Sequence, residues 1–494
     1  CFLFFILMSS ILPSSVQLPP QVRPSISSTW TVFRESLGFD KRLFLGNGPA
    51  TFGYSYSLHR PLTLNQTDLW PFRFNQGFSF LLTVLSTTGI LGILAIVFLI
   101  FCFVRLLKKK FTRRSFNGDG PVSPSVFIAA VGAGFLFLTW LFAPLFFTQA
   151  LFIFMGLGLA TALADSKKEI SFAGLNNYFV FVIFIFCAVL IMGGFYSLSL
   201  AGKKYAGAIY YAKGLSSVNL QGNLDKAISQ LDKARQLDTD SDQYFRTLSQ
   251  LLFAKTGEIA KQNASSESPQ IAQAEIQNAI AITAQVARQA TVINSQDSLN
   301  WDNLGSIYEG FIPLAADAAD LAEESYLKAA ALDPKNPQEL VNLARGLVSA
   351  VDIYGADNSG LKQEKLNKAR SYLESALKLK NDYAPANFLA AVVALREGKI
   401  DEAISRLELI KQSVSLNAEL AFQLGLLYYQ NNQFDKAKLE FQRSVDNNPD
   451  NSNTRYFLGL IYDQLGNKAG ALSQFKKVAE LNPDNEEVKK IVEN

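Results

Sequence analysis

Long stretches without a charged residue alternate with polar stretches in the N-terminal part of the chain. The first of these, residues 78–104, can form a helix that crosses the apolar core of a membrane, which takes about 20 residues. The next, residues 120–164, is too long for one such helix. A turn around Pro144 divides it into two predicted spans, at about 125–143 and 147–164.

Two further apolar runs complete the predicted membrane domain. Residues 178–200 form the last span, and residues 1–12 form part of one. The run at the start begins at Cys1, with no basic stretch before it and no clear small-residue cleavage site after it, which disfavours a signal peptide. We therefore expect a polytopic α-helical membrane domain that is truncated at its N-terminus.

The short loops predict how these spans are oriented. The stretch RLLKKKFTRR, residues 105–114, carries six Lys and Arg side chains directly after a span, and such clusters mark the cytoplasmic side. Counting the crossings then predicts that the loop 13–77 and everything after residue 202 lie outside the cytoplasm. The expected location is the cytoplasmic (inner) membrane of a bacterium.

Residues 203–494 follow a different pattern, in which small and large apolar residues recur with a period of 34. The period and residue types resemble those of tetratricopeptide repeats (TPRs), each a pair of helices. One pair cannot bury its apolar face alone, so we expect about seven pairs stacked into an α-solenoid. The residues that carry the pattern are Trp301, Leu304, Gly305, Tyr308, Leu424, Gly425, Tyr428, Ala437, Phe441, Pro449, Leu458, Gly459, Tyr462, Ala471, Phe475 and Pro483. Residues 257–300 break the period, and the sequence predicts a polar loop there followed by a long helix.

Charge and composition narrow the function of the repeat domain. It is net acidic while the membrane part is net basic, so nucleic-acid binding is not expected. It lacks cysteine, a phosphate-binding glycine loop and clustered Cys or His residues, and we therefore expect neither a cofactor nor a metal. The predicted partner of the solenoid is a protein or peptide bound in its groove.

Candidate chemistry lies in the outer loop, residues 13–77. This loop holds His59, the only histidine of the chain. Guanidinium groups bind phosphate oxygens in paired hydrogen bonds, so a cationic loop beside a membrane suits an anionic, lipid-linked substrate. The alternative is that the arginines of the loop are scattered surface charges. The candidate diphosphate-binding residues are Arg23, Arg34, Arg60 and Arg73.

A Gly-Asn-Gly element, a polar stretch and an apolar run with two glycines three apart follow one another along the loop. The residues concerned are Gly46, Gly48, Phe78, Ser79, Gly89 and Gly92. This order resembles the C-terminal part of the O-antigen ligase and Wzy-type polymerase family, which is often joined to helical repeats. The resemblance implies transfer or polymerisation of a polyprenyl-diphosphate-linked glycan at the outer face of the membrane. Loop arginines would hold the diphosphate, and a histidine near the membrane surface would serve as base or would orient the acceptor hydroxyl.

Phe78 stands where that family carries its histidine, and a phenylalanine transfers no proton. Three alternatives follow. His59 takes over the role; or Asp68, Glu35, a residue outside the sequence or no base at all is used; or the site is inactive. The second hypothesis for the whole chain is therefore a non-catalytic, membrane-anchored TPR scaffold for assembly of the cell envelope.

Overall fold

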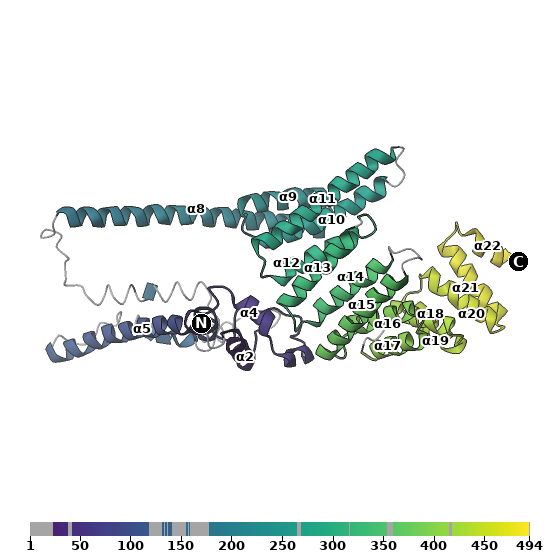
Figure 1. Cartoon of the computed structure of the whole chain (residues 1–494), viewed down its shortest axis with the longest axis horizontal. Coiled ribbons are helices and arrows are strands. Elements are labelled where there is room, and N and C mark those ends of the chain that lie inside the picture. Colours follow the sequence, from purple (N-terminus) through teal and green to yellow (C-terminus); the bar gives the residue numbers. More distant parts are fainter. Residues whose placement is uncertain are drawn as a thin grey trace, which may run out of the picture. The chain divides into compact units, whose positions relative to one another are not determined.

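The computed structural model describes the chain in several stretches. They are residues 23–37, 42–117, short pieces between 131 and 158, and residues 177–263, 268–315, 317–352, 359–413 and 417–493. Every regular element in these stretches is a helix, which confirms the all-α prediction (Figure 1). The predicted partial span 1–12 and most of the spans 125–143 and 147–164 lie outside the described residues.

The chain divides into two compact units. One comprises Cys1–Leu64 and Pro71–Asn176, and the other comprises Asn65–Trp70 and Asn177–Asn494. We call them the loop unit and the repeat unit and describe each by itself. The short segment 65–70 is thus a part of the outer loop that belongs structurally to the repeat unit.

The loop unit contains short helices followed by one long helix. They are α2 (Ile26–Leu37), α3 (Arg42–Leu45), α4 (Phe52–His59), the 3-10 helix η1 (Leu62–Gln66), which ends inside the segment 65–70, and α5 (Phe80–Asn117). The first turn of α2 is capped by the Ser25 hydroxyl, which accepts the backbone N–H of Ser28 at 3.1 Å. Its buried residues Val32 and Leu37 face the interior of the unit.

Two helices of the described chain are long and apolar enough to cross a membrane. They are the part Phe80–Arg105 of α5 and the part Phe181–Gln221 of α8 (Asn177–Gln221). Large apolar side chains along both are exposed, Phe98 to 67% and Phe184 to 70%, as expected for helices that face lipid. The orientation and the inner-membrane location stay predictions.

Helix α8 continues past the predicted end of the last span. Its 45 residues include both the span and the first helix of the repeats (Figure 1). Beyond residue 202 it packs on α9, and Gly207 lies close enough that a Cβ there would be 3.3 Å from the Ala234 carbonyl oxygen. The predicted span and the repeats are therefore joined by continuous helix, where the sequence predicted a boundary.

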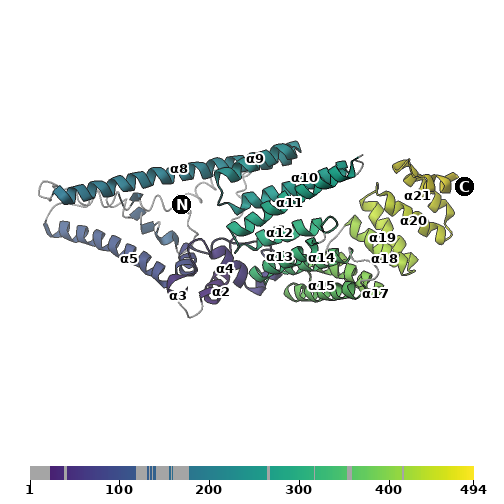
Figure 2. The same ribbon diagram turned by 45° about the horizontal axis from the view of Figure 1, so that its top comes forward.

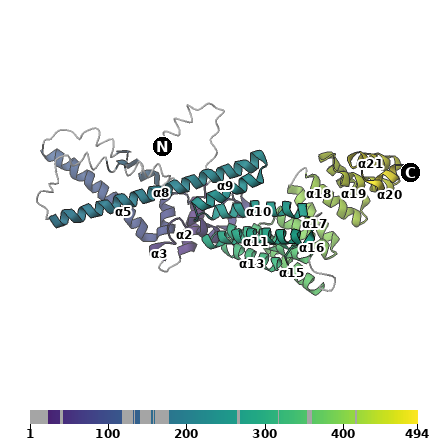
Figure 3. The same ribbon diagram turned by 90° about the horizontal axis from the view of Figure 1, so that it is seen from above.

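In the repeat unit, α8 pairs with α9 and is followed by six further helix pairs and α22 in the described residues (Figures 2 and 3). The helices are α9 (Leu224–Leu237), α10 (Asp242–Asn263), α11 (Pro269–Ile293), α12 (Ser298–Phe311), α13 (Ala318–Leu332), α14 (Pro337–Val351), α15 (Ser359–Leu379), α16 (Ala384–Arg396), α17 (Ile400–Ser413), α18 (Ala418–Gln430), α19 (Phe434–Asn447), α20 (Ser452–Gln464), α21 (Lys468–Leu481) and α22 (Glu486–Glu493). The part of the predicted polar loop up to Asn263 is helical instead. Its polar residues continue α10. The buried hydroxyl oxygens of Thr256 on α10 and Thr283 on α11 lie 3.2 Å apart.

Short polar residues define where many of these helices begin. The side chain before the first turn accepts a backbone N–H at 2.9–3.1 Å and so satisfies a donor that the helix leaves free. These capping residues are Asn223, Asp297, Asn336, Asn417, Asn451 and Asn467.

The predicted small residue of each repeat allows its two helices to approach closely. A Cβ on Gly425 would lie 2.6 Å from the ring of Phe441, and one on Gly459 would lie 2.9 Å from the ring of Phe475. Most residues of the repeat pattern are buried in this way. The exceptions are Trp301 and Tyr462, which are half-buried, and Pro449 and Pro483, which follow the ends of α19 and α21 and are exposed.

Candidate functional site

The long helix α5 is broken at Gly89, close to its start. Gly89 has φ 64° and ψ −160°, a conformation open almost only to glycine. A break of this kind frees carbonyl groups from the helix ladder. Two backbone N–H groups of the loop bind these carbonyls. The Gly48 N–H donates to the backbone carbonyl oxygen of Thr87 at 2.8 Å, and the Asn47 N–H donates to that of Ser86 at 3.4 Å.

The contact needs glycine on both sides. A Cβ on Gly46 would lie 2.2 Å from the Thr87 carbonyl carbon, and one on Gly89 would lie 2.5 Å from the Phe44 carbonyl oxygen. The structure thus brings Gly46, Gly48 and Gly89 together in one backbone contact, which we call the glycine contact. Gly92 plays no visible part in it, since the atoms nearest to its Cβ position belong to α5 itself.

Phe78 lies just before α5, beneath an arginine. The guanidinium carbon of Arg23 is 4.5 Å from the centre of the Phe78 ring, a cation–π arrangement. The Phe78 N–H donates to the Thr29 hydroxyl at 2.9 Å, which ties the start of α5 to α2. Ser79 is buried, and its hydroxyl accepts the Leu82 N–H at 3.4 Å in the first turn. The aromatic ring just before α5 therefore packs against an exposed cation.

The histidine of the chain faces a carboxylate. His59 Nδ1, at the end of α4, lies 3.9 Å from Oε2 of Glu35 on α2, and Arg34 Nη2 lies 4.0 Å from the other Glu35 oxygen. Two candidate bases of the loop are thus neighbours. The two groups form an ion pair only when His59 is protonated. Asp68, the third candidate, belongs to the repeat unit.

The four candidate arginines differ in exposure. Arg23 and Arg34 are exposed, Arg73 is half-buried, and Arg60 is only 2% exposed. A phosphate in solvent can reach Arg23 and Arg34 without rearrangement of the chain, whereas Arg60 is enclosed by protein. Among the described residues no group of three or more His, Cys, Asp or Glu side chains could hold a metal ion.

In the repeat unit, polar side chains join neighbouring pairs. Glu309 of α12 accepts hydrogen bonds from the Tyr326 hydroxyl at 2.6 Å, from Arg345 Nε at 3.0 Å and from the Ser349 hydroxyl at 3.1 Å. Burial, together with the Glu309 charge, raises the pKa of Tyr326. Each partner of the network is engaged, so its role is to hold α12, α13 and α14 together.

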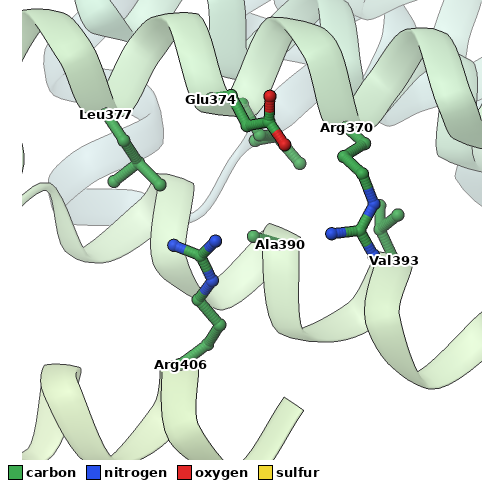
Figure 4. A pocket seen from close by; sticks show the side chains of 7 residues that line it. Arg370, Glu374, Leu377, Ala390, Val393 and Arg406 are labelled. Atoms are coloured by element: carbon green, nitrogen blue, oxygen red, sulfur yellow. The ribbon is translucent and has the colours of Figure 1, made fainter. Parts of the chain in front are cut away.

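Hollows occur in the described part of the repeat unit, among them the following two. The first lies among α15, α16 and α17, where Arg370 and Arg406 flank Ala390 (Figure 4). Its volume of about 10 Å³ suits at most a water molecule. Its Arg370 is already paired with Glu397 and Glu402 at 2.5 and 2.7 Å. The second, about 360 Å³ and open, lies between α10, α11 and the segment after α12. The first is too small for a small-molecule ligand, and the second is lined by apolar and uncharged polar side chains.

Comparison with known proteins identifies the repeats. Two tetratricopeptide-repeat family models match residues 360–424 and 422–486. The C-terminal part of the chain therefore consists of tetratricopeptide repeats, a helical solenoid of the kind that binds proteins, as the period of 34 predicted. No curated protein matches the chain significantly.

Solved structures of repeat proteins resemble this part of the chain weakly. MamA from Desulfovibrio magneticus RS-1 is 20% identical over 38% of this chain and 97% of its own, with a TM-score of 0.31. YrrB, described as a TPR protein with an unusual peptide-binding site, is 18% identical over 43% and 100%, with a TM-score of 0.31. Pseudomonas aeruginosa PilF is 16% identical over 48% and 98%, with a TM-score of 0.34. Likenesses this distant carry no argument about function.

Proposed function

We propose that the chain is a glycan ligase- or polymerase-like membrane protein whose repeats bind a protein partner or the glycan acceptor. The loop unit would act on a glycan carried by a polyprenyl diphosphate at the outer face of the cytoplasmic membrane. The repeat unit is a protein-interaction scaffold by its repeats alone. The glycan chemistry rests on the loop unit.

The glycine contact is the observation that supports this proposal most. The family resemblance depends on a Gly-x-Gly element in the loop and on a glycine where the chain enters the membrane. In the fold these two motifs meet backbone to backbone at Gly46 and Gly89, and Gly48 donates to the carbonyl oxygen of Thr87. Their spacing in the sequence thus has a physical reason, because the loop supplies the donors that the broken helix lacks.

The exposed charges of the loop unit fit the expected chemistry. The acceptor hydroxyl oxygen attacks the first carbon of the lipid-linked sugar, the bond from that carbon to the diphosphate oxygen breaks, and polyprenyl diphosphate leaves. Arg23 and Arg34 would neutralise its charge, since guanidinium groups match phosphate oxygens. His59, which lies 3.9 Å from Glu35, would accept the proton of the hydroxyl.

A second candidate function is a membrane-anchored scaffold without catalysis. The observation that favours it is Phe78, which lies under Arg23 where the family histidine would stand. An aromatic ring that packs against a cation gives structure and no proton transfer. In that case the repeats would organise envelope proteins and the loop unit would serve as their anchor.

Deletion of the gene, with analysis of surface glycan length and attachment, separates the two functions. Altered glycans support the ligase-like proposal, and normal glycans with dispersed envelope complexes contradict it. Complementation with His59→Ala and Arg23→Ala then tests the site, with Lys203→Ala, an exposed cation of α8, as the matched control. Unaltered activity in both loop variants, at normal protein level, would remove these residues from the site.

A further inference from the structure

One segment of the outer loop is built into the repeat unit. Residues 65–70 carry Asn65, whose side chain has no exposed surface. Its amide nitrogen donates to the carbonyl oxygen of Lys335 at 2.9 Å and lies 3.3 Å from that of Leu379. The two hydrogens of one amide thus serve two separate repeats.

Both acceptors are backbone carbonyl oxygens close to the ends of helices. Leu379 is the last residue of α15, and Lys335 lies in the turn between α13 and α14. The last carbonyls of a helix have no donor inside it and need one from outside. Asparagine is suited to this position, because its amide supplies two donors on one short side chain.

Trp70 forms the second point of attachment. Its ring meets that of Tyr383 edge to face, with centroids 5.1 Å apart and planes at 72°. Tyr383 precedes α16 and is 5% exposed, and Trp70 packs on the apolar cluster that Tyr383 shares with α14 and α15. Between the two anchors, Gln66, Thr67 and Asp68 are exposed. One buried end, one half-buried end and an exposed middle are the pattern of a peptide held at two points.

We propose that residues 65–70 are a docking segment, through which the repeat unit recognises and holds the outer loop of its own chain. The segment follows Arg60 and precedes Arg73 by a few residues, so docking restrains the loop backbone on both sides of it. This proposal stands whether or not the loop acts on a glycan.

Hydrogen exchange of the full-length protein in detergent tests the docking segment. Asn65→Ala and Trp70→Ala are expected to speed amide exchange of residues 62–73 by roughly tenfold or more, because each removes one attachment. Gln66→Ala, which changes an exposed neighbour of Asn65, is the matched control and should leave these rates unchanged.

The repeats far from the segment provide the folding control. Exchange in α18 to α21 is expected to stay as in the wild type. If both anchor variants exchange in residues 62–73 like Gln66→Ala, the segment is not held by Asn65 and Trp70. If protection is instead lost equally throughout α18 to α21, the residues stabilise the whole fold and the docking proposal is wrong.

Discussion

A methyl group added at Gly425 tests the packing that makes each repeat a unit. Its Cβ would lie 2.6, 2.7 and 3.0 Å from three atoms of the Phe441 ring, closer than carbon atoms pack. Phe441 has no exposed surface and stacks on Phe457 with centroids 5.7 Å apart. The ring therefore has no free space into which it can move.

The expected cost of Gly425→Ala combines two opposing terms. Alanine is favoured over glycine inside a helix by about 1 kcal/mol. Overpacking of a filled core costs about 1–3 kcal/mol. Gly257→Ala on α10 carries the first term alone, because nothing lies within 4 Å of its Cβ position. The stabilities of the two variants should thus differ by about 1–3 kcal/mol, with Gly257→Ala the more stable.

Thermal unfolding followed by far-UV circular dichroism measures this difference. Gly257→Ala should melt at or above the wild-type temperature, and Gly425→Ala a few degrees below Gly257→Ala. In the double variant Gly425→Ala, Phe441→Leu the two losses should not add, because the smaller side chain relieves the clash. A Gly425→Ala protein as stable as Gly257→Ala would refute the close-approach argument.

Three further outcomes are expected. Gly89→Ala adds a Cβ at a positive φ, 2.5 Å from the carbonyl oxygen of Phe44, so it should disrupt the glycine contact and speed proteolysis of the loop. Gly193→Ala, which has open space around its Cβ position, should not change the proteolysis rate. Burial and a nearby carboxylate raise the pKa of Tyr383 to about 12. An unfolded tyrosine loses its proton near pH 10, so the free energy of unfolding should fall by about 1.4 kcal/mol per pH unit from pH 10 to 12. In Tyr383→Phe it should fall less steeply. Equal dependence on pH in the two proteins, measured by urea unfolding, would contradict this. Glu323 is largely buried, and its carboxylate lies 2.5 Å from the amine of Lys365. Lys365→Met removes this cation and should lower the free energy of unfolding in urea by about 3 kcal/mol, and adding Glu323→Leu should recover most of the loss. A double variant as unstable as the single one would show that the pair does not matter.

Much of this fold could be predicted from local patterns in the sequence. Within a helix pair the contacts join residues close in sequence, so a period of 34 marks the buried positions directly, as at Gly425 and Phe441. The apolar runs that became α5 and α8 were recognisable for the same reason, since length and lack of charge are properties of one segment. For the loop, the sequence singled out Gly46, Gly48, Gly89 and Gly92, and the contact that the first three form appeared only in the fold.

Contacts between residues far apart in the sequence could not be predicted from such patterns. Asn65 bonds to carbonyls 270 and 314 residues away, and a single asparagine in a polar stretch carries no signal of burial. The pairing of His59 with Glu35 likewise depends on how α2 and α4 meet. The continuity of α8 and the helical end of α10 were missed because helices can extend through polar residues once a neighbour packs on them. The chain's local chemistry thus determined its helices and repeats, and tertiary packing decided which loop residues are held, paired or buried.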